Sequence, residues 1–362
     1  ENGQGAAADG GKMQGRCPLL EELRAGRAAS MQLRDMLPFC SQFCRDQFGS
    51  RFIQSKLDGA GERETAAVLA AVLPCAEELM RDLFGNYVVQ KLLERGSGEE
   101  RAALAGCMRG RVLALSLDTY GCRVVQRAVE LLEPDLQVAL VRELEGHVMA
   151  CVQDHNGNHV VQKCIERSAP EAIQFIMDDC RGQAALLAMH PYGCRVIQRM
   201  LENCTPQQIG PVLSEIMERA EDLVQDQYGN YVMQHVLEHG RPADRSAVLT
   251  RVQGRLVAMS RHKYASNVVE KLLQFAGPDT RQAVLTAVAG EFEGQPAVLA
   301  LMRDGYGNYV VQRALDVFQG EDRERLIACV REHAAAAKRF TYGKHILAYI
   351  DRLDAPAASS ST

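Results

Sequence analysis

Eight stretches of this chain repeat one combination of side chains that could recognise a planar, hydrogen-bonding ligand. Each has a small or amide residue, then a residue that is usually flat, and then a glutamine or glutamate three positions further on. On a helix, this spacing gathers all three on one polar side. A side-chain amide offers a donor and an acceptor together, which suits the mixed edge of a nucleobase, and a flat side chain offers a stacking surface. The eight sets are Ser50, Arg51, Gln54; Asn86, Tyr87, Gln90; Cys122, Arg123, Gln126; Asn158, His159, Gln162; Cys194, Arg195, Gln198; Asn230, Tyr231, Gln234; Ser266, Asn267, Glu270; and Asn308, Tyr309, Gln312.

The choice of residues in these sets is restricted. A glutamine closes seven of the eight sets, and Glu270 closes the other. A solvated helix face would accept Lys, Glu, Ser or Ala at this position and would not keep one amide. The middle residue is Tyr, His or Arg everywhere except Asn267. The sets therefore indicate a ladder of base-contacting and base-stacking side chains.

The spacing of the sets predicts the fold. Their first residues recur every 36 positions from Ser50 to Ser266, and Asn308 follows after six additional residues. A fixed period of this length is typical of stacked helical repeats. The apolar residues follow a 3.6-residue pattern without a sustained period-2 run. We predict an all-α fold, an α-α superhelical solenoid built as a crescent of eight three-helix repeats plus terminal caps.

The repeats define the expected domain boundaries. We expect one repeat domain over residues 16–353, with an N-terminal cap over about 16–43 and a C-terminal cap over about 330–353. Residues 1–15 and 354–362 have a composition typical of disordered tails. The segment 290–297 is expected to take up the six additional residues as a surface loop.

Two further recurring positions indicate local structure. An aromatic residue usually precedes the glycine before each set, and we expect it to pack between repeats. Acidic residues that precede the turns are expected to act as turn or cap residues rather than as catalytic carboxylates. They are Asp46, Asp82, Asp118, Asp154, Asp226 and Asp304.

Charge and cysteine content limit the possible functions. The formal net charge of −5 argues against a nucleic-acid partner, but the residue after each glutamine or its equivalent is basic from the second repeat onward. The twelve cysteines form no C-x-x-C pair, which favours free thiols in a reducing compartment. No apolar run is long enough to span a membrane, and the first residues lack a signal-peptide pattern. The basic row is Lys91, Arg127, Lys163, Arg199, His235, Lys271 and Arg313.

Two other classes of function were weighed. An enzyme would need a nucleophile with its base, a cluster of metal ligands or a phosphate loop, and the sequence has none of these constellations. We therefore expect no enzymatic activity, no cofactor and no metal. A helical-repeat scaffold that binds proteins is the remaining alternative, although it would not restrict all three positions of each set together.

The sets in this register resemble the Pumilio-type (PUF) RNA-binding domain, over roughly Arg16 to Leu353. The resemblance implies that each repeat presents its three residues to one base of a single-stranded RNA, with the middle residue stacking. It implies that Asn/Gln sets read uracil, that Ser/Gln and Cys/Gln sets read adenine and that Ser266 with Glu270 reads guanine. Because such proteins run antiparallel to RNA, the implied target is UGUAUAUA in mRNA 3′ untranslated regions.

The resemblance also implies a cellular role. It implies cytoplasmic control of mRNA translation and decay through deadenylation or repression machinery, with co-regulators binding at the loop 290–297. A tolerated insertion is an equally open interpretation of that loop, because surface loops lengthen at little cost. We further expect a monomer without a membrane partner.

Overall fold

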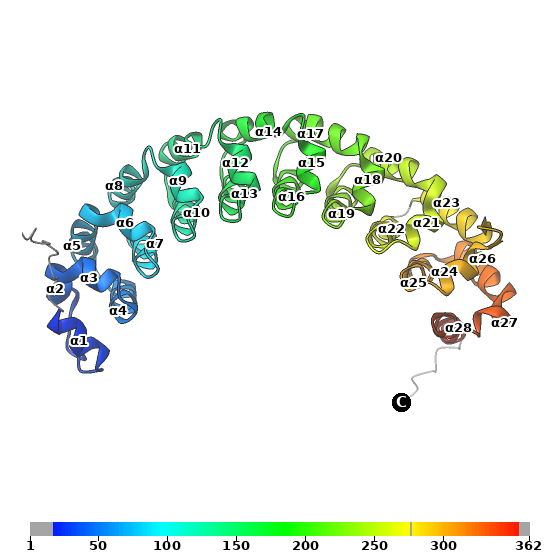
Figure 1. The fold of residues 1–362 in the computed structure, drawn as a ribbon, viewed down its shortest axis with the longest axis horizontal. Coiled ribbons are helices and arrows are strands. Elements are labelled where there is room, and N and C mark those ends of the chain that lie inside the picture. Colours follow the sequence, from blue (N-terminus) through cyan, green and yellow to red (C-terminus); the bar gives the residue numbers. More distant parts are fainter. Residues whose placement is uncertain (1–16, 276, 355–362) are drawn as a thin grey trace, which may run out of the picture. The chain divides into compact units, whose positions relative to one another are not determined.

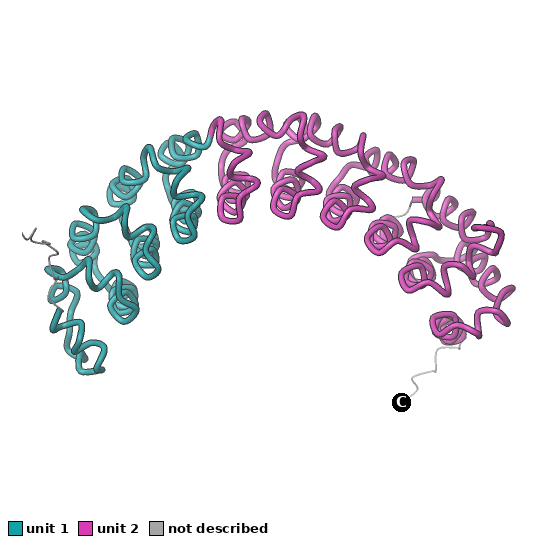
Figure 2. The backbone as a smooth tube through the Cα atoms, viewed as in Figure 1, with its two compact units in different colours: residues 1–144 teal, residues 145–362 magenta. Residues whose placement is uncertain are grey.

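The computed structural model describes residues 17–275 and 277–354, and these residues are almost entirely helical. The chain divides into two compact units, residues 1–144 and 145–362, which are described separately (Figure 2). The predicted tails lie outside the described residues, except that Asp354 still ends the last helix. No described helix is long and apolar enough to cross a membrane.

The first unit contains a cap and three repeats. The cap consists of α1 (Pro18–Arg24), α2 (Leu33–Met36) and the 3₁₀ turn η1 (Leu37–Phe39). The repeats are α3 (Cys40–Cys44), α4 (Gln47–Asp58) and α5 (Glu62–Val72); then η2 (Leu73–Cys75), α6 (Ala76–Met80), α7 (Gly85–Arg95) and α8 (Gly98–Met108); then α9 (Val112–Ser116), α10 (Gly121–Leu131) and α11 (Pro134–Arg142).

The second unit contains five repeats and a cap. The repeats are α12 (Val148–Gln153), α13 (Gly157–Arg167), η3 (Pro170–Ala172) and α14 (Gln174–Cys180); α15 (Ala184–Ala188), α16 (Gly193–Asn203) and α17 (Pro206–Glu218); α18 (Ala220–Gln225), α19 (Gly229–His239) and α20 (Pro242–Val252); η4 (Gln253–Arg255), α21 (Leu256–Ser260), α22 (Ala265–Gln274) and α23 (Pro278–Ala289); and α24 (Ala297–Met302), α25 (Gly307–Val317) and α26 (Gly320–Glu332). The cap is α27 (Ala334–Ala337) and α28 (Thr341–Asp354).

Within each unit, the second helices of successive repeats lie side by side, and the third helices form the opposite layer (Figure 1). The first layer is α4, α7 and α10 in one unit and α13, α16, α19, α22 and α25 in the other. Apolar side chains hold these layers together. In α19, Val232, Met233, Val236 and Leu237 are fully buried, so the polar side of the same helix is left outward.

Each second helix begins at a tight, hydrogen-bonded turn. The Oδ1 atom of Asp226 accepts hydrogen bonds from the backbone N–H groups of Tyr228 and Gly229, both at 2.8 Å. The other five predicted aspartates make the same two contacts in their repeats, so their role as turn residues is confirmed. In repeats five and seven, where the aspartate is missing, the Nδ1 atoms of His190 and His262 accept these bonds instead.

The glycine at this turn allows the first and second helices to approach closely. A methyl group on Gly229 would lie 2.8 Å from the carbonyl oxygen of Leu223, which is too short for carbon and oxygen. Repeat seven has Ala265 at this position, and its side chain is fully buried.

The structure adds detail to two of the expected segments. The expected N-terminal cap, about 16–43, overlaps α3, which packs on α4 as the first helix of repeat one after the chain turns at Pro38 in η1. The segment 290–297, expected to be a surface loop, contains a short hairpin of β1 (Glu291–Phe292) and β2 (Gln295–Pro296). Glu293 and Gly294, with φ of 51° and 73°, make the two-residue turn that hairpins favour.

Candidate nucleic-acid interface

The three positions of each set follow one pattern of exposure, with a single exception at Gln198. The first residue is buried, with no more than 3% of its surface exposed. The middle residue is exposed in every set, and the tyrosines Tyr87, Tyr231 and Tyr309 are about half exposed. The last residue is half-buried except for Gln198, which is buried. The polar side therefore presents a row of exposed flat groups beside a row of partly covered amides within each unit.

In the four Asn/Gln sets, the asparagine fixes the orientation of the glutamine. Asn86 Nδ2 donates to the backbone carbonyls of Asp82 and Leu83, at 2.8 and 3.0 Å. Its Oδ1 atom is thereby turned toward Gln90, whose Nε2 donates to it at 2.9 Å. The same contacts recur around Asn158, Asn230 and Asn308. One N–H and the carbonyl oxygen of the glutamine amide remain for a ligand, in a fixed direction.

The Ser/Gln and Cys/Gln sets orient their glutamines differently. Gln126 Nε2 donates to the backbone carbonyl of Cys122 at 2.9 Å, and Gln54 Nε2 donates to Ser50 Oγ at 3.0 Å. Gln198 Nε2 is buried without a hydrogen-bond partner among the described residues. The Nε2 group of the glutamine therefore has a different acceptor beside a smaller neighbour than beside an asparagine, and in Gln198 it has none among the described residues.

The cysteines form no disulfides, and the thiol of Cys194 has a higher pKa than an ordinary thiol. All twelve cysteines lie among the described residues and none forms a disulfide. Burial raises the pKa of the Cys194 thiol, and the nearby Arg195 only partly opposes this effect. Because a thiolate is the nucleophilic form, a raised pKa argues against catalysis by this residue.

Glu270 differs from the seven glutamines in its charge. Burial raises the pKa of its carboxyl group, and the positive charge of Arg313 partly offsets this shift. Arg313 Nε is itself buried without a hydrogen-bond partner among the described residues. The Glu270 carboxylate of the seventh set is thus a hydrogen-bond acceptor, and a ligand that donates hydrogen bonds to it would stabilise its ionised form.

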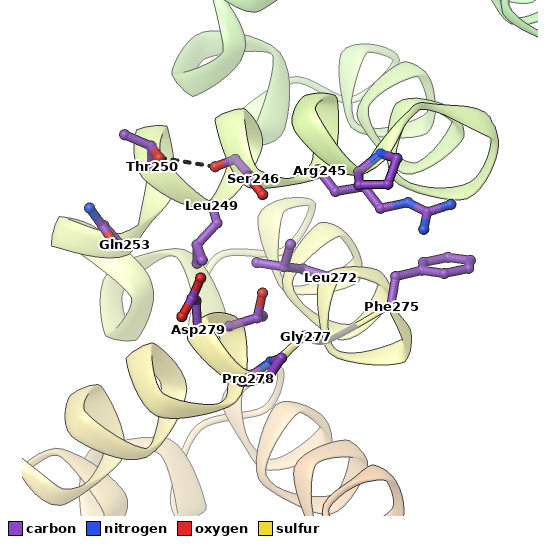
Figure 3. Close-up of a pocket in the computed structure, with 12 residues that line it drawn as sticks. Arg245, Ser246, Leu249, Thr250, Gln253, Leu272, Phe275, Gly277, Pro278 and Asp279 are labelled. Atoms are coloured by element: carbon purple, nitrogen blue, oxygen red, sulfur yellow. Dashed lines mark hydrogen bonds between the residues drawn. The ribbon is translucent and has the colours of Figure 1, made fainter.

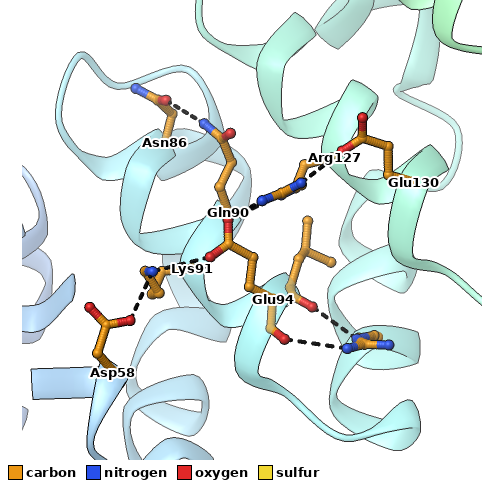
Figure 4. A network of polar contacts seen from close by, with 9 residues as sticks. Asp58, Asn86, Gln90, Lys91, Glu94, Arg127 and Glu130 are labelled. Atoms are coloured by element: carbon orange, nitrogen blue, oxygen red, sulfur yellow. Dashed lines mark hydrogen bonds and ion pairs between the residues drawn. The ribbon is translucent and has the colours of Figure 1, made fainter. Parts of the chain in front are cut away.

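Five members of the predicted basic row, Lys91, Arg127, Lys163, Arg199 and Lys271, are paired with carboxylates that were not predicted from the sequence. Lys91 Nζ lies 3.0 Å from Asp58 of the preceding repeat and 3.1 Å from Glu94 of its own (Figure 4). Arg127 continues the pattern, with Nε 3.1 Å from Glu94 and Nη1 2.8 Å from Glu130. Although burial raises the pKa of Glu94, hydrogen bonds from Arg127 and Lys91 outweigh it and lower that pKa overall.

This alternation recurs in the second unit, where Arg199 contacts Glu166 and Glu202, and Lys271 contacts Glu238. An acidic residue lies four positions after each of the seven glutamines, and this recurrence in the sequence could have indicated the ion pairs. The row ties neighbouring second helices together, and it presents less positive charge than its residue types imply. Each such exposed pair contributes only about 0–1 kcal/mol.

The flat residues lie within reach of their neighbours. The Arg195 guanidinium carbon lies 5.9 Å from the centre of the Tyr231 ring in the next repeat. The aromatic residues before the glycines are less buried than expected. The ring centres of Tyr192 and of His155 in the preceding repeat lie 5.7 Å apart. Phe48 and Tyr306, in contrast, are 49% and 42% exposed. Packing between repeats therefore accounts for only some of them.

One pocket lies away from all of these residues. Its volume is about 370 Å³, and α20, the end of α22 and the start of α23 line it (Figure 3). Arg245 lies over the Phe275 ring at 4.6 Å on one side of the pocket and donates to the Leu237 carbonyl at 2.8 Å. Because the pocket contains none of the residues of the eight sets, it is not part of the surface that these sets form.

Comparison with known proteins identifies the repeats. A sequence profile described as the Pumilio-family RNA binding repeat matches eight segments, namely residues 39–73, 76–105, 111–145, 147–179, 183–217, 220–252, 255–289 and 297–330. Among curated proteins, the chain is 49% identical over 56 residues to Pumilio homolog 1 of Xenopus laevis, and 41% identical over 55 residues to the mRNA-binding protein puf3 of Schizosaccharomyces pombe. These alignments cover 16% and 15% of this chain but only 5% and 8% of those proteins.

Solved structures match over nearly the whole chain. The crystal structure of PUF-8 in complex with PBE-RNA has a TM-score of 0.88 and 39% identity, covering 92% of this chain and 99% of that one. The Puf3 RNA binding domain bound to a Cox17 RNA 3′ UTR recognition sequence has a TM-score of 0.84 and 34% identity, with coverage of 92% and 99%. The predicted all-α superhelical solenoid is confirmed. With its eight matched repeats, the chain belongs to the Pumilio family of RNA-binding repeat proteins.

Proposed function

We propose that this chain binds single-stranded RNA sequence-specifically, with one base per repeat, and that its target is UGUAUAUA. The observation that carries the proposal is the exposure pattern that the eight sets share: a buried first residue, an exposed middle residue that is flat in seven sets, and a closing amide or carboxylate that is half-buried in all sets except that of Gln198. Flat side chains stack on any base, whereas the amide edge discriminates between bases. Two solved relatives that are bound to RNA, PUF-8 and Puf3, support RNA as the ligand.

The base assignments follow the family code. The four Asn/Gln sets read uracil, the Ser50, Cys122 and Cys194 sets read adenine, and the Ser266 set reads guanine. Hydrogen-bonding capacity supports the first assignment, because uracil places an N–H donor between two carbonyl acceptors. The fixed glutamine beside Asn230 offers a matching carbonyl and N–H.

Glu270 supplies the sharpest discrimination. Guanine offers two donors, N1–H and the 2-amino group, to an ionised carboxylate that only accepts. Adenine would direct a lone pair at the same carboxylate, and uracil would supply one donor. Part of the selectivity therefore comes from leaving a half-buried charge unpaired when the wrong base binds.

A randomised RNA pool, selected on this chain and sequenced, tests the target directly. The variant Ser266→Asn with Glu270→Gln carries the assignment further, because it copies the Asn230 and Gln234 pattern into repeat seven. It should prefer UUUAUAUA over UGUAUAUA by about tenfold to a hundredfold, the scale of a two-point base contact. Glu270→Gln alone is the matched control and should mainly lose affinity for UGUAUAUA. If the double variant still favours guanine at the second base, the proposed pairing of repeats with bases is wrong.

The cellular role is the second part of the proposal. A binder without catalytic groups acts through partners, so we propose repression of translation or promotion of mRNA decay in the cytoplasm, by a monomer that recruits other proteins. The hairpin 290–297 is the proposed co-regulator contact, and Phe292 on it lies 5.2 Å from the Arg261 guanidinium carbon. Replacing the hairpin with the short connection of another repeat should abolish co-regulator capture at unchanged RNA affinity; unchanged capture would mark it as a tolerated insertion.

A further inference from the structure

Three side chains suited to a metal ion meet beside the reading helices of repeats five and six. His235 and His239 lie one turn apart on α19, and Glu202 lies on α16. One possible ligand atom from each lies within 4.8 Å of the other two. None belongs to the eight sets, and the sequence alone did not indicate them, because Glu202 is distant in the chain.

The contact between Glu202 and His235 is close but unsatisfied. His235 Nδ1 lies 3.2 Å from Glu202 Oε1, yet this buried nitrogen has no hydrogen-bond partner of acceptable geometry among the described residues. An imidazole nitrogen and a carboxylate oxygen that face each other without a hydrogen bond are two electron-pair donors with room for a shared acceptor.

The surroundings orient these groups. Arg199 binds the other carboxylate oxygen of Glu202, which leaves Oε1 directed at His235. The His235 and His239 rings stack at 5.3 Å with 27° between their planes. His239 is exposed, so an ion can enter from solvent. Arg199 also pairs with Glu166, and Lys271 pairs with Glu238, so each of these neighbouring cations has a carboxylate partner outside the cluster.

We propose that Glu202, His235 and His239 form a binding site for Zn²⁺ that bridges repeats five and six. Two imidazoles and one carboxylate are a common protein ligand set for zinc, and water would complete a four-coordinate ion. The hard cations Ca²⁺ and Mg²⁺ prefer all-oxygen sites and fit this set poorly. Because its ligands come from α16 and α19, bound zinc ties two neighbouring second helices together.

Titration of the whole chain with Zn²⁺, in competition with a chromogenic chelator, tests the site. One equivalent should bind with an affinity that falls by about tenfold or more in His239→Gln and in Glu202→Gln, since even outer-shell changes cost that much. Co²⁺ in place of Zn²⁺ should give the intense visible bands of a four-coordinate ion. Zinc should also raise the melting temperature of the parent chain more than that of either variant, since ligand binding to the folded state stabilises it.

His345→Gln is the matched control, because it removes one exposed imidazole from α28 and leaves the cluster intact. It should bind zinc as the parent chain does. His239 is exposed, so its replacement leaves the fold in place, and Glu202→Gln keeps the side-chain shape. Equal zinc affinity in the parent chain and both cluster variants, or a Co²⁺ spectrum identical to that of the hydrated ion, would overturn the proposal.

Discussion

Gln234 donates a hydrogen bond of 3.1 Å from Nε2 to Oδ1 of Asn230, and Asn230 is itself held by two backbone carbonyls. Because those carbonyls can only accept, the asparagine amide has one permitted orientation, and it passes that orientation to the glutamine. Asn230 is therefore buried, but it still determines which atoms of the Gln234 amide face a ligand.

Asn230→Ser should change the base preference of repeat six from uracil to adenine. The substitution replaces the amide acceptor of Gln234 Nε2 with a serine hydroxyl, as in the pattern of Ser50 and Gln54. We expect binding to UGAAUAUA to exceed binding to UGUAUAUA by about tenfold, at the lower end of the range for a two-point contact. Competition between the two RNAs in fluorescence anisotropy measures this ratio. Equal loss of affinity for both would show that Asn230 only maintains the fold.

The affinity of this chain for UGUAUAUA should fall at acidic pH more than the affinity of a variant with an uncharged glutamine at position 270. Burial raises the pKa of Glu270, so this carboxyl group takes up a proton at a higher pH than an ordinary glutamate. The ionised form accepts both guanine donors; affinity for UGUAUAUA is thus full above the raised pKa and falls as the pH drops through it. Glu270→Gln should lack this component. Affinities measured across mildly acidic buffers check the difference, and parallel curves for the two proteins would contradict it.

Gly229→Ala should destabilise the fold without touching a reading residue. The added methyl group would meet the Leu223 carbonyl oxygen at 2.8 Å, so α18 and α19 must move apart. Overpacking of this kind costs about 1–3 kcal/mol in the free energy of unfolding. Chemical denaturation measures the loss.

The matched control for that change is Gly59→Ala, where a methyl group would meet nothing within 4 Å. It should change the free energy of unfolding far less than Gly229→Ala. Equal effects would mean that the close approach of α18 and α19 is not what requires glycine.

Glu94→Gln should strengthen RNA binding and make it more sensitive to salt. Glu94 pairs with both Lys91 and Arg127, so its neutralisation releases positive charge beside the second and third sets. Each additional phosphate neutralised should steepen the slope of log affinity against log salt by about 0.7. Glu62→Gln on α5 is the control, because it removes the same charge from an exposed site on a third helix. Identical salt slopes for the two variants would refute a role of this row toward RNA.

The sequence alone determined the repeat, its period and the residues on its polar side. Those features are local: a glycine, a small or amide residue and a glutamine four positions later select a helix face whatever lies around it. The turn aspartates such as Asp226 were equally predictable, because their hydrogen-bond partners lie two and three residues away.

Tertiary structure decided which charges remain available and how the helices meet. The sequence does not show that Arg127 is paired, but Glu94, 33 residues earlier, accepts a hydrogen bond from it. The same holds for the cluster of Glu202 with His235, which also spans 33 residues. A contact at this separation depends on how far one helix is displaced and rotated against the next, and side-chain packing between repeats sets that geometry.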